Sequence, residues 1–432
     1  MGREMKHTEI GDIPADWEVQ TFEETFQVLT NNTLSRADLN DSEGTIRNIH
    51  YGDILTRYSE VLDCGNENIP FLNSSSLLTA TAMPLQDGDV ILADTAEDET
   101  VGKATEIYGL GEKKMVAGLH TIPCRVKKGN FAPHWLGYYM NSHVYHNQLL
   151  PYITGIKVSS ISKSAIAGTM ILVPPLLEQE KIVAVLSEID ALIVNLQKLI
   201  GKHKAIKQGC LGCMFPRNGQ TVPERRLPGF TCDWELRKLG EIAEFRTGPF
   251  GTQLKANEYT PEGTPVINVK NIGSEHIIPD NLDHIPEKVA RRLRDHALQY
   301  GDIVFGRKGA VDRHAFIKKE ETGWIQGSDC IRMRLKLNYI VPLFVTYELS
   351  LPTLISQIKN MAVGGTMISL NPDILSNLVF SMPAESYEQQ SIGTFFHHLD
   401  HLITLNQRKA EKYKMIKQGI MSELLTGKIR PV

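Results

Sequence analysis

The sequence has no long uninterrupted apolar run and few cysteines for its length. No stretch of about 18 apolar residues occurs in the chain, so we do not expect a membrane-spanning helix or a membrane partner. The polar start, Met1-Gly-Arg-Glu-Met-Lys-His-Thr, lacks the apolar core of a signal peptide. Six cysteines spread over 432 residues are typical of reduced thiols. The sequence therefore predicts a cytoplasmic protein.

No long part of the chain is strongly basic. Residues 1–177 carry 13 Lys and Arg against 22 Asp and Glu, a net charge of −9. Residues 225–384 carry 20 against 18, a net charge of +2. Composition alone therefore gives no sign of a nucleic-acid partner.

Complete catalytic and cofactor motifs are also missing from the sequence. We find no phosphate-binding Gly-rich loop ending in Gly-Lys-Ser/Thr, and Gly109-Leu-Gly111 lacks the third glycine of a dinucleotide fingerprint. Asn371-Pro-Asp-Ile lacks the aromatic residue with which an amino-methyltransferase stacks a flipped base. His397 and His401 are four apart, but a pair of this kind usually flanks a helix seam in solvent. We expect no metal site and no catalytic residues in this chain.

What the sequence does contain is an internal repeat, at a spacing of about 209–220 residues. Six matches occur in the same order in both halves. They are Asp16-Trp17-Glu18 with Asp233-Trp234-Glu235, Asn48 with Asn268, Gly88-Asp89 with Gly301-Asp302, Gly155 with Gly365, Pro174 with Pro383, and Ile206-Lys-Gln-Gly209 with Ile416-Lys-Gln-Gly419.

Each half has the same plan. A block of short β-branched and aliphatic runs, bounded by Gly, Asp and Asn and mixed with helical stretches, is followed by one long helical segment. We therefore predict a mixed α/β (α+β) fold with a pseudo-twofold internal repeat. The expected divisions are a first globular domain at 1–177, a central helix at 178–214, a linker and second globular domain at 215–384, and a C-terminal helix and tail at 385–432.

The two long segments show a heptad pattern, with seam positions at alternating spacings of three and four. The first seam reads Ile182, Val185, Ile189, Leu192, Leu196, Leu199, His203, Ile206, Cys210 and Cys213. The second reads Ile392, Phe395, Leu399, Leu402, Asn406, Lys409, Tyr413, Ile416, Ile420 and Glu423. The Cys-x-x-Cys pair thus falls on two seam positions, which favours a packing role over a zinc site. We expect the helices, each about 54 Å long, to pack antiparallel within the chain; homodimerisation is the alternative.

This arrangement resembles the specificity subunit of a type I restriction–modification system. The residues that carry the resemblance lie at the helix starts, the helix ends and the second globular domain. They are Pro174-Pro175-Leu-Leu-Glu178-Gln179, Glu388-Gln389, Lys204 to Gly209, Lys414 to Gly419, Leu424-Leu-Thr-Gly-Lys428, Gly248-Pro-Phe-Gly251-Thr-Gln-Leu-Lys255 and Gly301-Asp-Ile-Val-Phe-Gly306-Arg307.

The resemblance implies a non-catalytic, sequence-specific DNA-binding subunit in a bacterial or archaeal cytoplasm. Its two target-recognition domains would each read half of a bipartite, asymmetric site on double-stranded DNA, and the antiparallel coiled coil would be the spacer. Two methylation subunits, and restriction subunits, would dock on the chain. S-adenosylmethionine, ATP and Mg would bind to those partners. A rigid helix pair suits this task, because half-sites on one face of B-DNA lie about 34 Å, or a multiple of it, apart.

Base readout requires Arg, Lys, Asn, Gln, Ser or Thr on exposed loops. In the first domain the candidate DNA contacts are Asn31, Asn32, Arg36, Asn48, His50, Tyr51, Lys103, Lys157, Ser159 and Ser160. In the second they are Thr252, Gln253, Lys255, Arg291, Arg292, Arg294, Arg307, Lys308, Arg313, Thr366 and Ser369.

Two other classes of function stay open at this point. One is a stand-alone methyltransferase or nuclease with built-in recognition domains, which the missing motifs disfavour. The other is a coiled-coil protein–protein scaffold. The first domain's net charge of −9 opposes phosphate binding. We therefore expect the chain alone to bind DNA weakly and to gain affinity from positively charged methylation subunits. The sequence does not predict the recognised bases or the spacer length.

Overall fold

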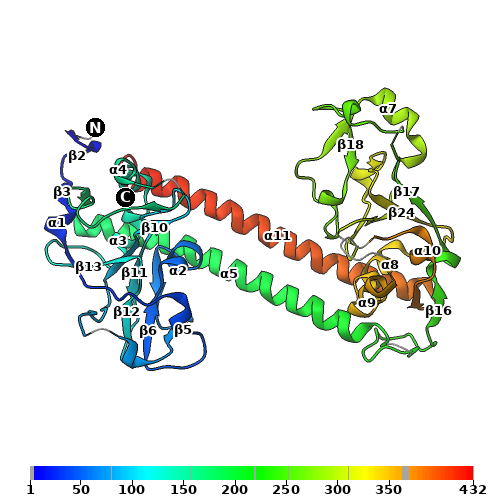
Figure 1. Ribbon diagram of the computed structural model, residues 1–432, viewed down its shortest axis with the longest axis horizontal. Helices are drawn as coiled ribbons and strands as arrows, with labels where there is room; N and C mark the ends of the chain where they lie inside the picture. Colours follow the sequence, from blue (N-terminus) through cyan, green and yellow to red (C-terminus); the bar gives the residue numbers. More distant parts are fainter. Residues whose placement is uncertain are drawn as a thin grey trace. The chain divides into compact units, whose positions relative to one another are not determined.

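The computed structural model describes residues 4–78, 80–155, 157–217, 220–251, 253–309, 311–361 and 369–431. The chain divides into two compact units, which Figure 1 shows in sequence colours. Unit 1 contains Met1–Asn195 and Lys409–Val432, and unit 2 contains Leu196–Arg408. Each unit therefore takes one half of each long helix, and the chain leaves unit 1 and returns to it.

Unit 1 is built around a five-stranded and a four-stranded sheet. The first has the order β4 (Phe26–Val28), β13 (Thr121–Val126), β9 (Val90–Ala93), β11 (Ala104–Tyr108) and β7 (Val61–Asp63). The second has the order β12 (Lys114–Ala117), β6 (Ile46–Ile49), β8 (Phe71–Leu72) and β5 (Leu39–Asn40). Strand β9 is Val-Ile-Leu-Ala and is buried along its whole length, because apolar side chains pack on both of its faces.

Shorter elements complete unit 1. The two-stranded pairs are β1 (Met5–Thr8) with β2 (Gly11–Pro14), β3 (Glu18–Thr21) with β15 (Met170–Val173), and β10 (Thr95–Ala96) with β14 (Ser159–Ser160). The short helices are α1 (Phe22–Thr25), α2 (Tyr51–Thr56), α3 (Trp135–Met140) and α4 (His143–Leu149).

Unit 2 repeats this plan. Its five-stranded sheet has the order β17 (Ala243–Thr247), β24 (Cys330–Leu335), β21 (Ile303–Gly306), β22 (His314–Phe316) and β19 (Ser274–Glu275). A second sheet has the order β20 (Asp283–Ile285), β18 (Thr264–Ile267) and β23 (Ile325–Gln326), and β16 (Glu235–Lys238) pairs with β25 (Val379–Met382). The short helices are α6 (Leu239–Ile242), α7 (Glu287–Arg292), α8 (Pro342–Leu349), α9 (Pro352–Met361) and α10 (Pro372–Ser376).

The repeat is visible in individual side chains. In unit 1, Arg125 of β13 forms a two-pronged ion pair with the buried Asp89, at 2.8 and 2.7 Å. In unit 2, Arg334 of β24 binds Asp302 in the same way, at 2.7 and 2.6 Å. The aspartates belong to the repeated Gly-Asp motif, which therefore marks a structural ion pair at the start of each central strand.

One of the predicted sequence matches is wrong. Ile49 accepts a backbone hydrogen bond from Gly118, and Ile267 accepts the equivalent bond from Gly327. Ile49 and Ile267 are thus equivalent, so the partner of Asn268 in the repeat is His50 and not Asn48. The sequences around the two asparagines look similar, but strand pairing sets the correspondence two residues further on.

The long helices are α5 (Leu176–Met214) and α11 (Ser386–Leu424). In unit 1, Ile182 and Leu186 of α5 share a core with Met421 and Leu424 of α11. In unit 2, Leu211 and Met214 of α5 share a core with Ile392, Phe396 and Leu399 of α11. Early α5 thus meets late α11, and late α5 meets early α11, so the helices pair antiparallel in both units, as predicted.

The buried face of the helices is not the predicted seam. Of the predicted seam positions, only Ile182, Ile189, Ile392 and Leu399 are fully buried. The intervening residues Val185, Leu192, Leu199, Ile206, Leu402 and Ile416 keep 36–45% of their surface exposed, and Lys409 is exposed too. The buried row instead uses the next residue along: Leu186, Ile193, Lys207, Met214, Phe396, Ile403, Ala410, Lys417 and Leu424. Val185-Leu186 and Leu192-Ile193 are each apolar pairs, so periodicity could not decide between two neighbouring rows.

The remaining predicted seam positions are partly buried. These are Leu196, His203, Cys210, Cys213, Phe395, Asn406, Tyr413, Ile420 and Glu423. Cys210, Cys213 and Phe395 pack against the core of unit 2, and Ile420 packs against that of unit 1. The two cysteines are free thiols, so they fill space at the helix end.

A buried lysine joins each globular part to the helix pair. In unit 1, Lys417 of α11 binds Asp190 of α5 at 2.7 Å and Glu60 of the globular part at 2.6 Å. Its Nζ lies 5.2 Å from the ring centre of Tyr138, whose hydroxyl donates to Asp190 at 2.7 Å. The two long helices and the globular part of unit 1 therefore meet at one ammonium group.

Unit 2 contains the equivalent cluster with the helices exchanged. Lys207 of α5 binds Asp400 of α11 at 2.8 Å and Glu275 at 3.1 Å. Its Nζ lies 5.2 Å from the Tyr347 ring, and the Tyr347 hydroxyl donates to Asp400 at 2.8 Å. The two lysines are those of the repeated Ile-Lys-Gln-Gly sequence.

Candidate nucleic-acid interface

In unit 1, polar and aromatic side chains gather where β6, β9 and β12 end. Asp94 and Thr95 follow β9, His50 and Tyr51 follow β6, and His120 lies in the turn after β12. Thr95 Oγ1 lies 3.2 Å from His120 Nδ1 and donates to Asp94 Oδ1 at 2.8 Å. The Tyr51 ring meets His120 edge-on at 5.3 Å. Segments far apart in the sequence thus present hydrogen-bonding groups side by side.

The backbone fixes this arrangement. The Asp94 N–H donates to His120 O at 3.1 Å, and the Asp94 carbonyl accepts from Ile161 N at 2.9 Å. His120 has a φ of 57°, in the left-handed region that residues other than glycine rarely occupy. Such conformations persist where the surrounding structure holds them, and they concentrate at functional sites.

Several predicted contacts in unit 1 have internal structural roles instead. Asn32 and Asn48 are 1% and 0% exposed, and Asn32 Nδ2 donates to Asn48 Oδ1 at 2.7 Å. We therefore correct the prediction that these two residues touch DNA: they are inside the domain. His50 is also largely buried and accepts from Gly52 N at 3.1 Å as the N-cap of α2, and burial lowers its pKa.

The other predicted residues of unit 1 are partly or fully exposed. Asn31 donates to the Gly118 carbonyl at 3.1 Å, and Lys103 donates to the Leu55 carbonyl at 3.0 Å, with a pKa lowered by burial. Arg36 binds Asp53 at 2.7 Å with half of its side chain exposed. Lys157, Ser159 and Ser160 lie in or beside β14, which pairs with β10 and so places Ser160 opposite Thr95.

Unit 2 builds the same edge with different side chains. Arg307 and Lys308 follow β21; the Arg307 N–H donates to Asp329 O, and the Arg307 carbonyl accepts from Leu370 N, both at 2.8 Å. Lys308 pairs with Ser369 as an isolated bridge, as Thr95 pairs with Ser160 in unit 1. These bonds match those of Asp94 one for one.

Arg307 is the most distinctive side chain of this edge. Its guanidinium lies over the Phe250 ring at 4.6 Å, and Phe250 is 45% exposed. Its Nε and Nη1 are buried and donate to no acceptor among the described residues. Lys308 lies 3.4 Å from Asp329. The predicted pair Arg307 and Lys308 is thus brought together with Ser369.

The remaining predicted residues of unit 2 lie elsewhere. Arg292 is tied to Glu258 at 2.8 Å and to the Gln253 carbonyl at 2.8 Å. Arg291 pairs with Glu287 along the exposed α7. Lys255, Gln253, Arg294 and Arg313 are exposed, whereas Thr252 and Thr366 lie outside the described residues. The α7 surface adjoins the Arg307 edge, because Gln253, whose carbonyl accepts from Arg292, donates its N–H to the carbonyl of Phe250 at 2.9 Å.

Five residues of this edge were not predicted from the sequence: Asp94, Thr95, His120, Phe250 and Asp329. A signal was present, since extending the repeated Gly-Asp match by five residues aligns Asp94 with Arg307. Only Arg307 was selected, because an aspartate in an acidic domain does not stand out as a DNA contact.

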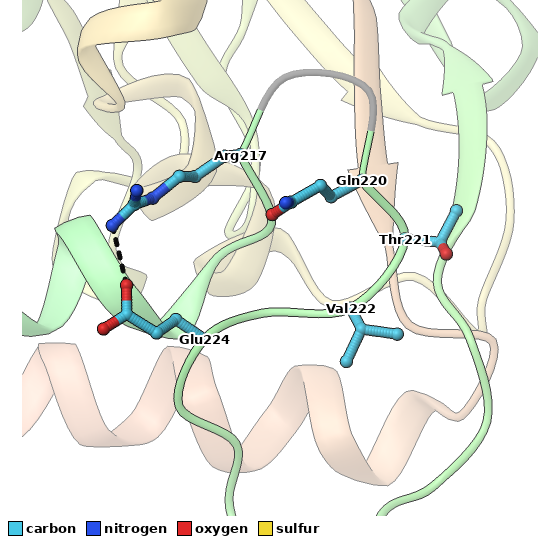
Figure 2. A pocket seen from close by; sticks show the side chains of 5 residues that line it. All are labelled: Arg217, Gln220, Thr221, Val222 and Glu224. Carbon is cyan, nitrogen blue, oxygen red and sulfur yellow. Dashed lines mark hydrogen bonds and ion pairs between the residues drawn. The ribbon is translucent and has the colours of Figure 1, made fainter.

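Hollows elsewhere in the described residues include one of about 650 Å³ in unit 1, lined in part by Asp89, Glu106 and His134. A hollow of about 530 Å³ is lined by Arg217, Gln220, Thr221, Val222 and Glu224, and Figure 2 shows these side chains. It belongs to the linker after α5, and its Arg217–Glu224 ion pair at 2.7 Å is solvent-exposed. No cluster of three potential metal ligands occurs in the described part of the chain, and none of its helices is long and apolar enough to cross a membrane.

Comparison with known proteins identifies one family whose model matches this chain. The type I restriction modification DNA specificity domain matches residues 14–208 and again 232–414. The chain is 24% identical to a protein assigned as the MjaX type I restriction enzyme specificity subunit of Methanocaldococcus jannaschii, over 98% of this chain and 96% of that one. It is 24% identical to the MjaVIII type I restriction enzyme specificity subunit of the same organism, over 64% of this chain and 66% of the relative.

Solved structures show the same fold. The S subunit of a type I restriction–modification system from M. genitalium matches with a TM-score of 0.59 and 14% identity, over 98% of this chain and 99% of the other. A chain from a structure of type I R-M complex assembly and conformational transition matches with a TM-score of 0.56 and 16% identity, over 96% and 99%. The predicted two-domain fold with paired helices is thereby confirmed.

Proposed function

Because the chain belongs to the type I restriction modification DNA specificity family, we propose that it reads a bipartite, asymmetric DNA site for a type I system. As a specificity subunit it is the non-catalytic member of that system. One observation carries the bipartite reading: two units share a backbone but present different side chains at the same edge, Asp94 with His120 and Arg307 with Asp329. Different side chains on one scaffold read different bases, so the two half-sites differ.

The long helices supply the spacer in this proposal. Each has 39 residues, which corresponds to about 58 Å of α-helix. Both run from one unit into the other, and each unit holds the pair through a buried lysine, Lys417 or Lys207. A helix pair held at both ends would keep a fixed gap between half-sites, whereas a flexible linker would not.

The exposed apolar row on the helices supports partner docking. Val185, Leu192, Leu199 and Ile206 recur every seven residues on α5, and Leu402 and Ile416 continue this character on α11. A heptad row that is not covered by its own chain is suited to a further helix. We assign it to two methylation subunits, with restriction subunits completing the complex in the cytoplasm of a bacterium or archaeon. Those partners would hold S-adenosylmethionine, ATP and Mg.

Genomic methylation mapping tests the proposal. Cells carrying this chain with its methylation subunits should show one bipartite motif with a fixed gap, and cells lacking the chain should lose it. Exchanging residues 225–384 for those of another specificity subunit should change one half-site and keep the other. A motif that survives deletion of the chain, or that tolerates any gap length, would refute the proposal.

A further inference from the structure

Asp94 and Arg307 occupy one structural position in the two units. Each follows the last residue of the central strand, β9 or β21. Each donates its backbone N–H to a carbonyl in the turn that precedes the neighbouring strand of the sheet, β13 or β24. The polar side chains around them differ as well. Asp94 lies 3.3 Å from His120, whereas Arg307 and Lys308 flank Asp329. The two units therefore have the same backbone hydrogen bonds at this position and differ in the side chain that it carries.

Part of the hydrogen-bonding capacity of Arg307 is unused within the described residues. Its Nε and Nη1 have no acceptor among the described residues, and a buried donor left without a partner destabilises the folded chain. Stacking on the exposed Phe250 holds the guanidinium plane at 4.6 Å. Both nitrogens are covered in the free chain, so contact with a ligand requires a change of rotamer along the flexible side chain.

Asp94 offers an acceptor of the opposite kind. Its Oδ1 accepts from Thr95 and lies near His120, and its side chain remains 24% exposed. Within the described residues, no hydrogen bond reaches Oδ2. A carboxylate repels phosphate, so an aspartate at a DNA-facing edge is suited to a base amino group.

Resting on the proposed function, we infer that position 94/307 is the paired specificity position of the two domains. Arg307 reads guanine, whose O6 and N7 accept from a guanidinium in the major groove. Asp94 reads cytosine, whose N4 amino group donates to a carboxylate. Each half-site therefore contains one G·C pair that is read by the same place in the fold, through opposite partners.

Single substitutions with matched controls test this inference in cells that carry the chain and its methylation subunits. Arg307→Gln should change one guanine to adenine in one half-site, because glutamine pairs with the N6 and N7 of adenine. Asp94→Asn should change one cytosine in the other half-site to adenine for the same reason. The exposed Arg237→Gln and Asp12→Asn, which lie on β16 and β2, should leave the motif unchanged.

Binding by the purified complex provides the second readout. With Arg307→Gln, duplexes that carry the original guanine should bind about 5- to 150-fold more weakly, while adenine duplexes should regain affinity. Methylation at an unchanged motif in both variants would overturn the inference. Equal loss of affinity for every duplex would overturn it too, because a structural role predicts that result. If the unmodified complex has no bipartite motif, the proposed function itself fails.

Discussion

Lys207 of α5 binds Asp400 of α11 at 2.8 Å inside unit 2, and Lys417 and Asp190 repeat this contact inside unit 1 with the helices exchanged. A lysine at a helix-pair interface is costly unless anions neutralise it. Here each ammonium has two carboxylates and a tyrosine ring. Because the carboxylates come from the other helix and from the globular part, each cluster fixes helix register and domain attachment together.

Removing one of these lysines should strongly destabilise its unit. We expect Lys207→Met to cost about 3–5 kcal/mol, because Glu275 and Asp400 would be left as neighbouring, partly buried charges without their cation. Urea unfolding measures the change. The exposed Lys204→Met, on the same helix, should cost within about 0.5 kcal/mol. The double variant Lys207→Met/Glu275→Gln should lose less free energy of unfolding than the sum of the two single variants. Strictly additive losses would show that the two residues do not stabilise the unit together.

Neighbouring residues on α5 provide a direct test of the corrected seam. Ile193 is 8% exposed and Leu192 is 45% exposed. Ile193→Ala should lower the free energy of unfolding by about 2–5 kcal/mol, whereas Leu192→Ala should change it little. Leu192→Ala should instead weaken co-purification of a methylation subunit if the exposed row is a docking face. If Leu192→Ala were more destabilising than Ile193→Ala, the buried row would be the one predicted from periodicity.

Stability should fall with rising pH because of a buried carboxyl group. Burial raises the pKa of Glu348 from an ordinary value of 4.5 to about 8, since Oε1 accepts from Ser381 but Oε2 has no partner among the described residues. Between these values the folded state keeps a proton that the unfolded state has lost, so stability falls as pH rises.

The Glu348→Gln variant stays neutral, so its free energy of unfolding should fall less as the pH rises. We expect the difference from the unmodified chain to be on the order of a few kcal/mol. Unfolding curves between pH ~5 and ~8 measure it. The exposed Glu262→Gln should follow the unmodified chain. The hypothesis is abandoned if both variants show the same pH slope.

The salt dependence of DNA binding should differ between the free chain and its complex with the methylation subunits. Residues 1–177 carry a net charge of −9, which opposes DNA phosphates, so the free chain should bind its site weakly and with a shallow salt slope. Each phosphate neutralised by a partner's Lys or Arg should steepen the slope by about 0.9. Fluorescence anisotropy over a salt series provides the measurement. Equal affinity for the free chain and the complex would show that the partners add no charge contacts.

The sequence alone determined the repeat, the mixed α/β class and the paired helices, because a repeated motif order and a heptad period depend only on residue type and spacing. It could not decide which of two adjacent apolar rows is buried, since Leu192 and Ile193 satisfy the same pattern. Tertiary structure decided that, by placing anions beside Lys207 and Lys417. It also placed the candidate DNA-binding edge, because Asp94, His120 and Ser160 meet only through strand pairing and turns that bring distant segments together.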